Sequence, residues 1–148
     1  MSDQVKNNIF YVCSLIEYLG RETKNRRADI ISFLGKKEIL RQLELAEINH
    51  CLSMEQVAEE LIDELGIPEG DFDSVGESLY LVPSIFAIAK DYQRLIIDVI
   101  KEEDNIADTI NDVFQSFISD EISDFNSAVF YSSPEYLKLS YKEGKLLL

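Results

Sequence analysis

Histidine and cysteine are scarce in this chain of 148 residues, which contains one histidine, His50, and two cysteines, Cys13 and Cys51. A zinc site needs about four Cys, His or carboxylate ligands, so these numbers leave almost no room for one. Two cysteines without CxxC spacing are too few for a disulfide framework, and their apolar neighbours predict buried free thiols. His50 and Cys51 are adjacent in the chain and point apart, which disfavours a Cys–His nucleophile.

Glycine-rich phosphate loops are absent, because neither G-x-G-x-x-G nor G-x-x-x-x-G-K-S/T occurs. Residues 71–76 begin like a calcium-binding loop, but Val75 and Val82 stand where oxygen ligands are needed. We therefore expect no metal and no cofactor. The first residues, MSDQVKNN, lack a secretory signal pattern, and no apolar run approaches the ~20 residues that span a bilayer. The expected location is cytoplasmic, with no membrane partner.

Glycine and proline are also few, at six and three residues, whereas an all-β chain needs a turn every 8–12 residues or so. Apolar residues recur instead at helical spacing. The broad apolar face of the first helix predicts a central helix that is contacted on two sides. The expected fold is all-α, a single compact bundle of six or seven helices with at most one very short β-hairpin. The predicted helices cover residues 3–22, 26–34, 37–49, 54–65, 83–102, 105–122 and 134–144.

The loop from residue 67 to 74 is dense in turn-forming residues and is the best candidate for an internal boundary. We expect one helical domain over residues 1–148. Its candidate division is an N-terminal subdomain 1–66, a loop 67–82 and C-terminal helices 83–148. Asn25 is expected to cap the second helix, Gly35 to end it, and Ser53 to open a capping box.

Acidic residues outnumber basic ones by 28 to 14, which gives a net charge of −14. Such a surface repels nucleic-acid phosphates and anionic membranes, and it attracts basic partners. The charge is distributed unevenly, because residues 1–41 carry +3 and residues 42–148 carry −17. The sequence therefore predicts a bipolar molecule.

The acids are most concentrated between residues 102 and 124, where Lys101 is the only adjoining base. Three of them recur at four-residue intervals, which places them on one face of the predicted helix. Charge runs of this kind are usually solvated surface, and that interpretation stays open. The alternative is a docking surface for a basic protein, formed by Glu102, Glu103, Asp104, Asp108, Asp112, Asp120, Glu121 and Asp124.

A basic region surrounds the second and third predicted helices, which are joined tightly through Gly35. This arrangement could be a DNA-binding helix-turn-helix. The presumed reading helix, however, carries Glu38, Glu44 and Glu47, so an ordinary helical hairpin is favoured and nucleic acid is disfavoured as a partner. The candidate phosphate-binding residues are Lys24, Arg26, Arg27, Lys36, Lys37 and Arg41.

Two stretches stand out near the ends of the chain, VCSLIEYLGRETKNRRADIISFLG and ISDEISDFNSAVFYSSPEYLKLSYKEG. They resemble a small, largely uncharacterised family of cytoplasmic bacterial proteins of about this length. Members of that family occur near genes for ADP-ribosyltransferase-like toxins. The resemblance implies an accessory or antitoxin-like role, and it carries over no functional residue.

The leading hypothesis is a non-enzymatic, acidic protein-interaction module, such as an antitoxin or immunity-type partner that covers a basic toxin surface. One alternative is a DNA-binding regulator that uses the basic region. Another is an enzyme with an unrecognised carboxylate site, for which two acids would meet in a deep pocket with shifted pKa values. We expect a protein partner, and homo-oligomerisation stays open.

Overall fold

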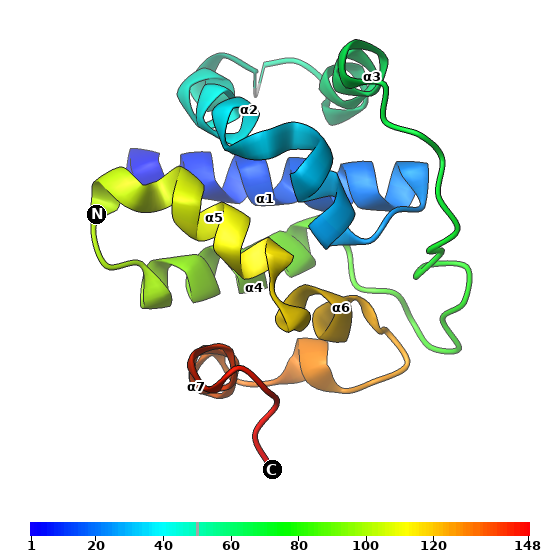
Figure 1. Ribbon diagram of the computed structural model, residues 1–148, viewed down its shortest axis with the longest axis vertical. Coiled ribbons are helices and arrows are strands. Elements are labelled where there is room, and N and C mark those ends of the chain that lie inside the picture. Colours follow the sequence, from blue (N-terminus) through cyan, green and yellow to red (C-terminus); the bar gives the residue numbers. More distant parts are fainter. Residues whose placement is uncertain (50) are drawn as a thin grey trace.

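The computed structural model describes residues 1–49 and 51–148, so His50 and the disfavoured His50–Cys51 site lie outside the described residues. Within these residues the chain forms seven α-helices, two short 3-10 helices and no strand, which confirms the all-α bundle (Figure 1). The elements are α1 (Asp3–Thr23), α2 (Arg27–Asn49), α3 (Met54–Leu65), α4 (Ile85–Val99), η1 (Glu103–Asn105), α5 (Ile106–Gln115), α6 (Phe117–Ser123), η2 (Val129–Tyr131) and α7 (Pro134–Glu143).

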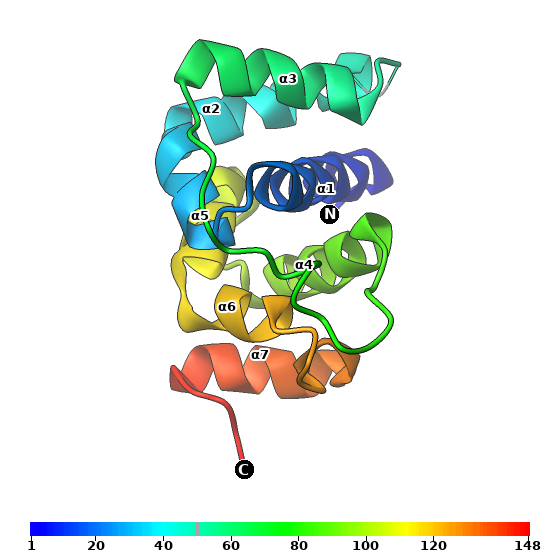
Figure 2. The same cartoon turned by 90° about the vertical axis from the view of Figure 1, so that its right-hand side faces the viewer.

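The α1 helix is the centre of the bundle, as its broad apolar face predicts. It packs against α2 on one side and α4 on the other, while α5 lies on α2 and α7 on α4. Figure 2 shows the resulting layers, from α3 and α2 through α1 and α4 to α6 and α7. One cluster of buried apolar side chains extends from Ile9 to Leu137 through these layers. The division into subdomains stays a prediction, and α1 contacts helices on both sides of the proposed boundary.

The second and third predicted helices form one helix, α2, with a kink at Gly35. Gly35 has φ 73° and ψ 161°, a backbone region that is essentially restricted to glycine. A residue with a Cβ would be strained there, although the space around it is open. Gly35 therefore interrupts the helix as expected, but the helix resumes at once without a separate turn.

The long helix predicted over residues 105–122 is divided at Ser116 into α5 and α6. Ser116 is extended, with φ −75° and ψ 167°, and it ends one helix and begins the next. Its hydroxyl donates to the Val113 carbonyl at 2.7 Å and accepts from the Ile118 N–H at 3.3 Å. Apolar periodicity continues across the break, so the spacing alone did not reveal it.

The two cysteines have different environments. Cys13 is buried in the core, as predicted, and burial raises the pKa of its thiol. Cys51 is exposed, so the prediction of a buried thiol was wrong for this residue. Its neighbour Leu52 is exposed too, because residues 51–52 form the turn between α2 and α3 and do not pack into the core.

A buried ion pair joins α1 to α2. Arg27 is only 1% exposed and donates from Nε and Nη2 to the two carboxylate oxygens of Glu17, at 2.9 and 2.8 Å. Arg21 donates to Glu17 Oε2 at 2.7 Å. Burial lowers the pKa of Arg27, but the charge of Glu17 and the hydrogen bonds to it outweigh burial and raise that pKa. Gly20 makes room for this arrangement, because a Cβ there would overlap the Arg27 side chain.

The loop after α3 is fastened to the turn between α1 and α2. The Gly70 N–H donates to the Thr23 carbonyl and the Phe72 N–H to the Lys24 carbonyl, both at 2.8 Å. The Asn25 side chain donates to the Pro68 carbonyl at 2.8 Å. Asn25 was expected to cap the second helix, but its side-chain amide instead bonds to the loop after α3.

Replacing Arg27 with methionine should lower the free energy of unfolding by about 3 kcal/mol, because Glu17 then keeps a buried charge without its main partner. Urea unfolding followed by circular dichroism measures this change. Arg26→Met is the matched control, since Arg26 pairs with Asp120 at the surface and its loss should cost at most about 1 kcal/mol. Equal losses in the two variants would contradict the assignment. Glu17→Met combined with Arg27→Met should be less destabilising than Arg27→Met alone.

Candidate functional site

The acidic segment, residues 102–124, lies on the surface of η1, α5 and α6. Three of its eight predicted site residues form ion pairs within the molecule. Glu103 pairs with the amino terminus at 3.1 Å, Asp108 with Lys36 at 3.4 Å, and Asp120 with Arg26. The other five form no ion pair with any described residue, and they are Glu102, Asp104, Asp112, Glu121 and Asp124.

The break at Ser116 divides these acids into two groups. Asp104, Asp108 and Asp112 precede it, and Asp108 and Asp112 line one depression of about 420 Å³ together with Lys101 and Tyr141. Burial, and secondly the charge of Asp112, raises the pKa of the Tyr141 hydroxyl. The acids that follow the break are carried by α6 and its C-cap, on the side where Asp120 meets Arg26. The segment is therefore bent around the bundle and does not form one straight acidic stripe.

The basic region turns towards acids of the same chain. Arg27 is buried against Glu17, and Arg26 and Lys36 pair with residues of the acidic segment. Lys24 and Arg41 pair with Glu69 and Glu38, so Lys37 alone of the six has no acidic partner among the described residues. A DNA-binding surface needs many exposed cations for phosphates. The geometry therefore offers little support for that alternative.

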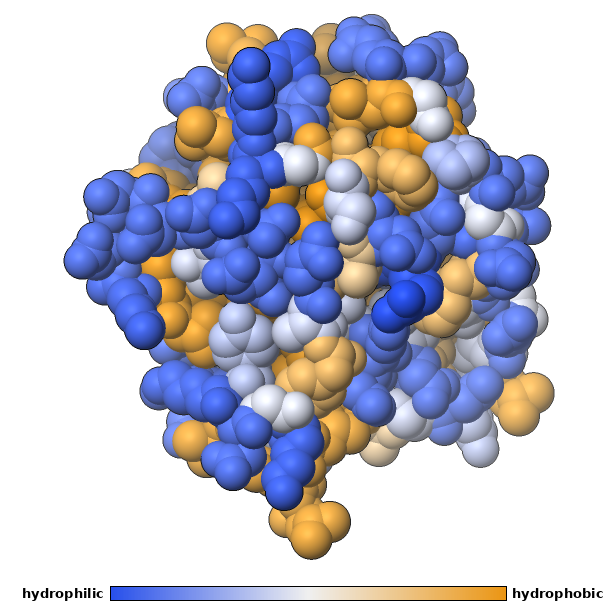
Figure 3. Space-filling model, viewed as in Figure 1, coloured by the Kyte–Doolittle hydropathy of each residue, from blue (hydrophilic) through white to orange (hydrophobic). Residues whose placement is uncertain are grey.

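Two long stretches of the sequence contain no lysine or arginine, and one of them includes the acidic segment. Residues 102–137 contain nine acids and no base, and residues 42–89 contain no base either. Figure 3 shows the face on which α5 and the first half of α2 lie in front, and hydrophilic residues cover much of it. The cations that pair with these acids are the amino terminus, Arg26 just before α2 and Lys36 of α2, and they neutralise only part of the charge. The unpaired acids leave a negative field at this surface.

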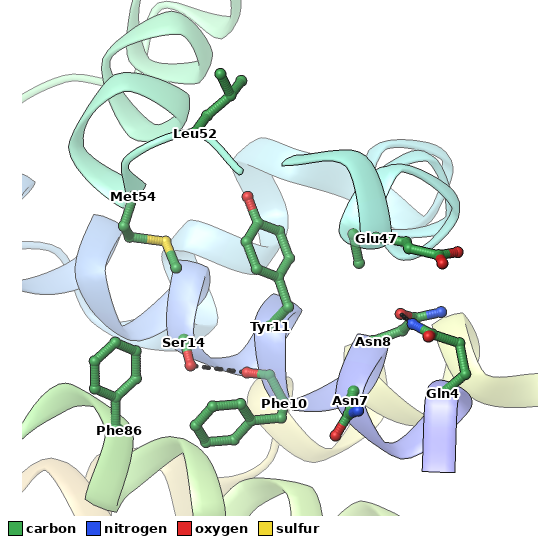
Figure 4. Close-up of a pocket in the computed structure, with 11 residues that line it drawn as sticks. Gln4, Asn7, Asn8, Phe10, Tyr11, Ser14, Glu47, Leu52, Met54 and Phe86 are labelled. Carbon is green, nitrogen blue, oxygen red and sulfur yellow. Dashed lines mark hydrogen bonds between the residues drawn. The ribbon is translucent and has the colours of Figure 1, made fainter. Parts of the chain in front are cut away.

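A cavity of about 580 Å³ lies between α1, the end of α2 and the start of α4. Figure 4 shows the rings of Phe10 and Phe86 on one side of it and side-chain amides on another. The two ring centroids are 5.9 Å apart. The Ser14 hydroxyl donates to the Phe10 carbonyl of its own helix at 2.8 Å, as is usual for a structural serine. No nucleophile and base meet among the described lining residues, which are Gln4, Asn7, Asn8, Phe10, Tyr11, Ser14, Ala46, Glu47, Leu52, Met54 and Phe86.

Asp91 of α4 is the acid with the most unusual environment. Its Oδ2 atom is buried and has no hydrogen-bond partner in the described part of the chain. Burial raises the pKa of Asp91 to about 6. The nearby Arg94 does not relieve it, because its Nε donates to both Asp98 oxygens, at 3.1 and 2.9 Å. The cavity beside Asp91 measures only about 10 Å³ and has no second acid among its described lining residues, so the two-acid pocket of the enzyme alternative is not found there.

Comparisons with known protein families, with curated proteins and with solved structures found no match to this chain. No helix in residues 1–49 or 51–148 is both long and apolar enough to cross a membrane. The same residues contain no group of three or more His, Cys, Asp or Glu side chains that could hold a metal ion.

A group of exposed apolar residues was not predicted from the sequence. Leu79, Tyr80, Leu81 and Tyr131 project from the two connections that precede α4 and α7. The motif SLYLVP contains the available signal, because its apolar residues follow no helical spacing and end at a proline. The sequence places residues 79–82 only in the loop before the C-terminal helices, and that assignment does not indicate an exposed apolar group.

Asp91 should make the stability of the protein depend on pH. The folded protein binds the Asp91 proton more tightly than the unfolded chain, so this residue's contribution favours folding at low pH and is lost as pH rises through about 6. Asp91→Asn should therefore be more stable than the parent at pH 7, by about 1 kcal/mol after allowance for partial exposure. The difference should vanish near pH 4. Urea unfolding of both proteins at pH 4 and pH 7 measures it, and an equal difference at the two pH values would contradict the prediction.

Proposed function

We propose that this chain is a non-enzymatic protein-interaction module, of the antitoxin or immunity type, that binds a basic partner protein through its acidic segment. The observation that supports the proposal is that most cations of the basic region form ion pairs with acids of the same chain. Arg26, Arg27 and Lys36 are held by acids of the same chain, and the segment keeps five acids without an ion pair to the described residues. The negative charge is thus directed outward.

Charge of this kind acts mainly on association. A negative surface attracts a basic partner from a distance, raises the association rate and disfavours acidic competitors. Arg26 and Lys36 pair with Asp120 and Asp108, and α2 packs against α5 and α6, so the helices that carry the acids are held in fixed positions. A pre-organised surface loses less entropy on binding than a mobile one.

The test compares three forms of the protein as baits in lysate of the native host. One variant neutralises the five unpaired acids, with Glu102→Gln, Asp104→Asn, Asp112→Asn, Glu121→Gln and Asp124→Asn. The matched control neutralises five exposed acids of α3, with Glu55→Gln, Glu59→Gln, Glu60→Gln, Asp63→Asn and Glu64→Gln. Both variants change the net charge by the same amount, so only the position of the charge differs.

We expect the parent and the α3 control to retain the same basic protein, and the segment variant to lose it by about tenfold or more in quantitative mass spectrometry. Retention should weaken as salt is raised, because the attraction between exposed charges is screened. If the two variants lose the same proteins equally, net charge alone accounts for binding and the proposal fails. It also fails if no basic protein distinguishes the parent from the segment variant.

A further inference from the structure

An apolar groove lies where the connection before α4 meets the connection before α7. It measures about 420 Å³, and its apolar walls are Tyr80, Leu81, Pro83, Phe125, Phe130 and Tyr131. Leu81 is 89% exposed, Tyr131 71% and Tyr80 68%, and the adjacent Leu79 is 82% exposed. Figure 2 shows the two connections side by side below α4. Contiguous exposed apolar side chains mark interaction sites more often than unused surface.

The backbone that carries these side chains is held in place. The Asn126 side chain donates to the Glu77 carbonyl at 3.1 Å and accepts from the Leu79 N–H at 2.7 Å, so one amide bonds the segment at two points. The Ser78 hydroxyl donates to the Tyr80 carbonyl at 2.8 Å. The leucines are therefore presented to solvent by an ordered segment. Binding to such a segment costs little additional ordering entropy.

The surroundings of the groove are acidic. The Asp124 carboxylate accepts from the Asn126 N–H at 3.1 Å, and the backbone carbonyl of Glu77 accepts from the Asn126 side chain at 3.1 Å, so both acidic residues lie beside Asn126 in the groove wall. The two stretches that build it, residues 67–89 and 102–137, contain no lysine or arginine. Arg21 does approach from below, since it donates to the Pro83 carbonyl and lies over the Phe125 ring. It shares the single carboxylate of Glu17 with Arg27, so its charge is only partly neutralised, but its side chain is only 15% exposed and lies behind the groove wall.

We propose that the apolar groove takes a segment of the basic partner in which apolar side chains alternate with lysine or arginine. The inference rests on the proposed function and adds an anchoring site to it. The apolar side chains fill the groove, and the cations meet the flanking acids and the acidic segment that ends at Asp124. A second copy of this chain is a poorer occupant, because two surfaces of the same negative charge would face each other. Aromatic and leucine side chains in such a groove determine how slowly the complex dissociates.

The test uses two labelled synthetic peptides of equal length and charge, one of alternating Lys and Leu and one of alternating Lys and Ser. Their dissociation constants for the full chain are measured by fluorescence anisotropy, and the contact surface by amide chemical shifts. The groove variant is Leu79→Ser with Leu81→Ser, which changes no charge and replaces side chains that are already exposed. The matched control is Ile48→Ser with Leu139→Ser, which removes exposed apolar residues elsewhere.

The parent should bind the Lys–Leu peptide at least about tenfold more tightly than the Lys–Ser peptide, with shifts centred on residues 77–83 and 125–131. The groove variant should lose this preference, and the control variant should keep it. An unchanged affinity of the groove variant overturns the groove and leaves the acidic-segment proposal standing, since that proposal is judged by the charge variants. A parent that sediments as a dimer, and a groove variant that sediments as a monomer, would assign the groove to a second copy and overturn the inference.

Discussion

The buried pair of Glu17 and Arg27 is the interaction on which the arrangement of α1, α2 and the following loop depends. Two charges removed from water are tolerated only when their hydrogen-bonding groups are satisfied. Glu17 accepts from both Arg27 and Arg21, and Arg27 donates further to the Asn25 carbonyl at 2.9 Å and the Ser74 hydroxyl at 3.3 Å. These partners come from α1, the α1–α2 turn and the loop after α3. Gly20 is required beside them because no Cβ fits against the Arg27 side chain.

This network has a consequence for the charge of the whole surface. It turns the basic part of the chain inward and towards α5 and α6, where Arg26 and Lys36 meet Asp120 and Asp108. The bipolar sequence thus folds into a molecule whose opposite charges partly neutralise each other across the contact of α2 with α5 and α6. What remains outward is the excess of acid, together with the exposed leucines and tyrosines near Asn126. A steering surface and an apolar anchor are the two parts that a protein-binding module needs.

The helices could be predicted largely because their signals are local. Ser53 accepts from a backbone N–H group at the start of α3, as expected from the sequence. Ser133 does the same at the start of α7, and Gly66 and Gly144 end these two helices in the left-handed conformation. The break at Ser116 could not be predicted, since a serine within apolar periodicity has no local signal of interruption. For the candidate site, the acids were identified but their partners were not. A side chain's ion-pair partner depends on which helices become neighbours.

The sequence by itself determined the all-α class, most helix positions, the net charge of −14 and the excess of acids over bases after residue 41. These properties follow from composition and from spacing within a few residues. Only the tertiary structure decided that Arg27 is buried, that Cys51 is exposed and that Asn126 holds residues 77–79 at the surface. Each of these depends on contacts between residues far apart in the chain. The burial or exposure of these three positions depends on such contacts, and the residues next to them in the chain do not indicate it.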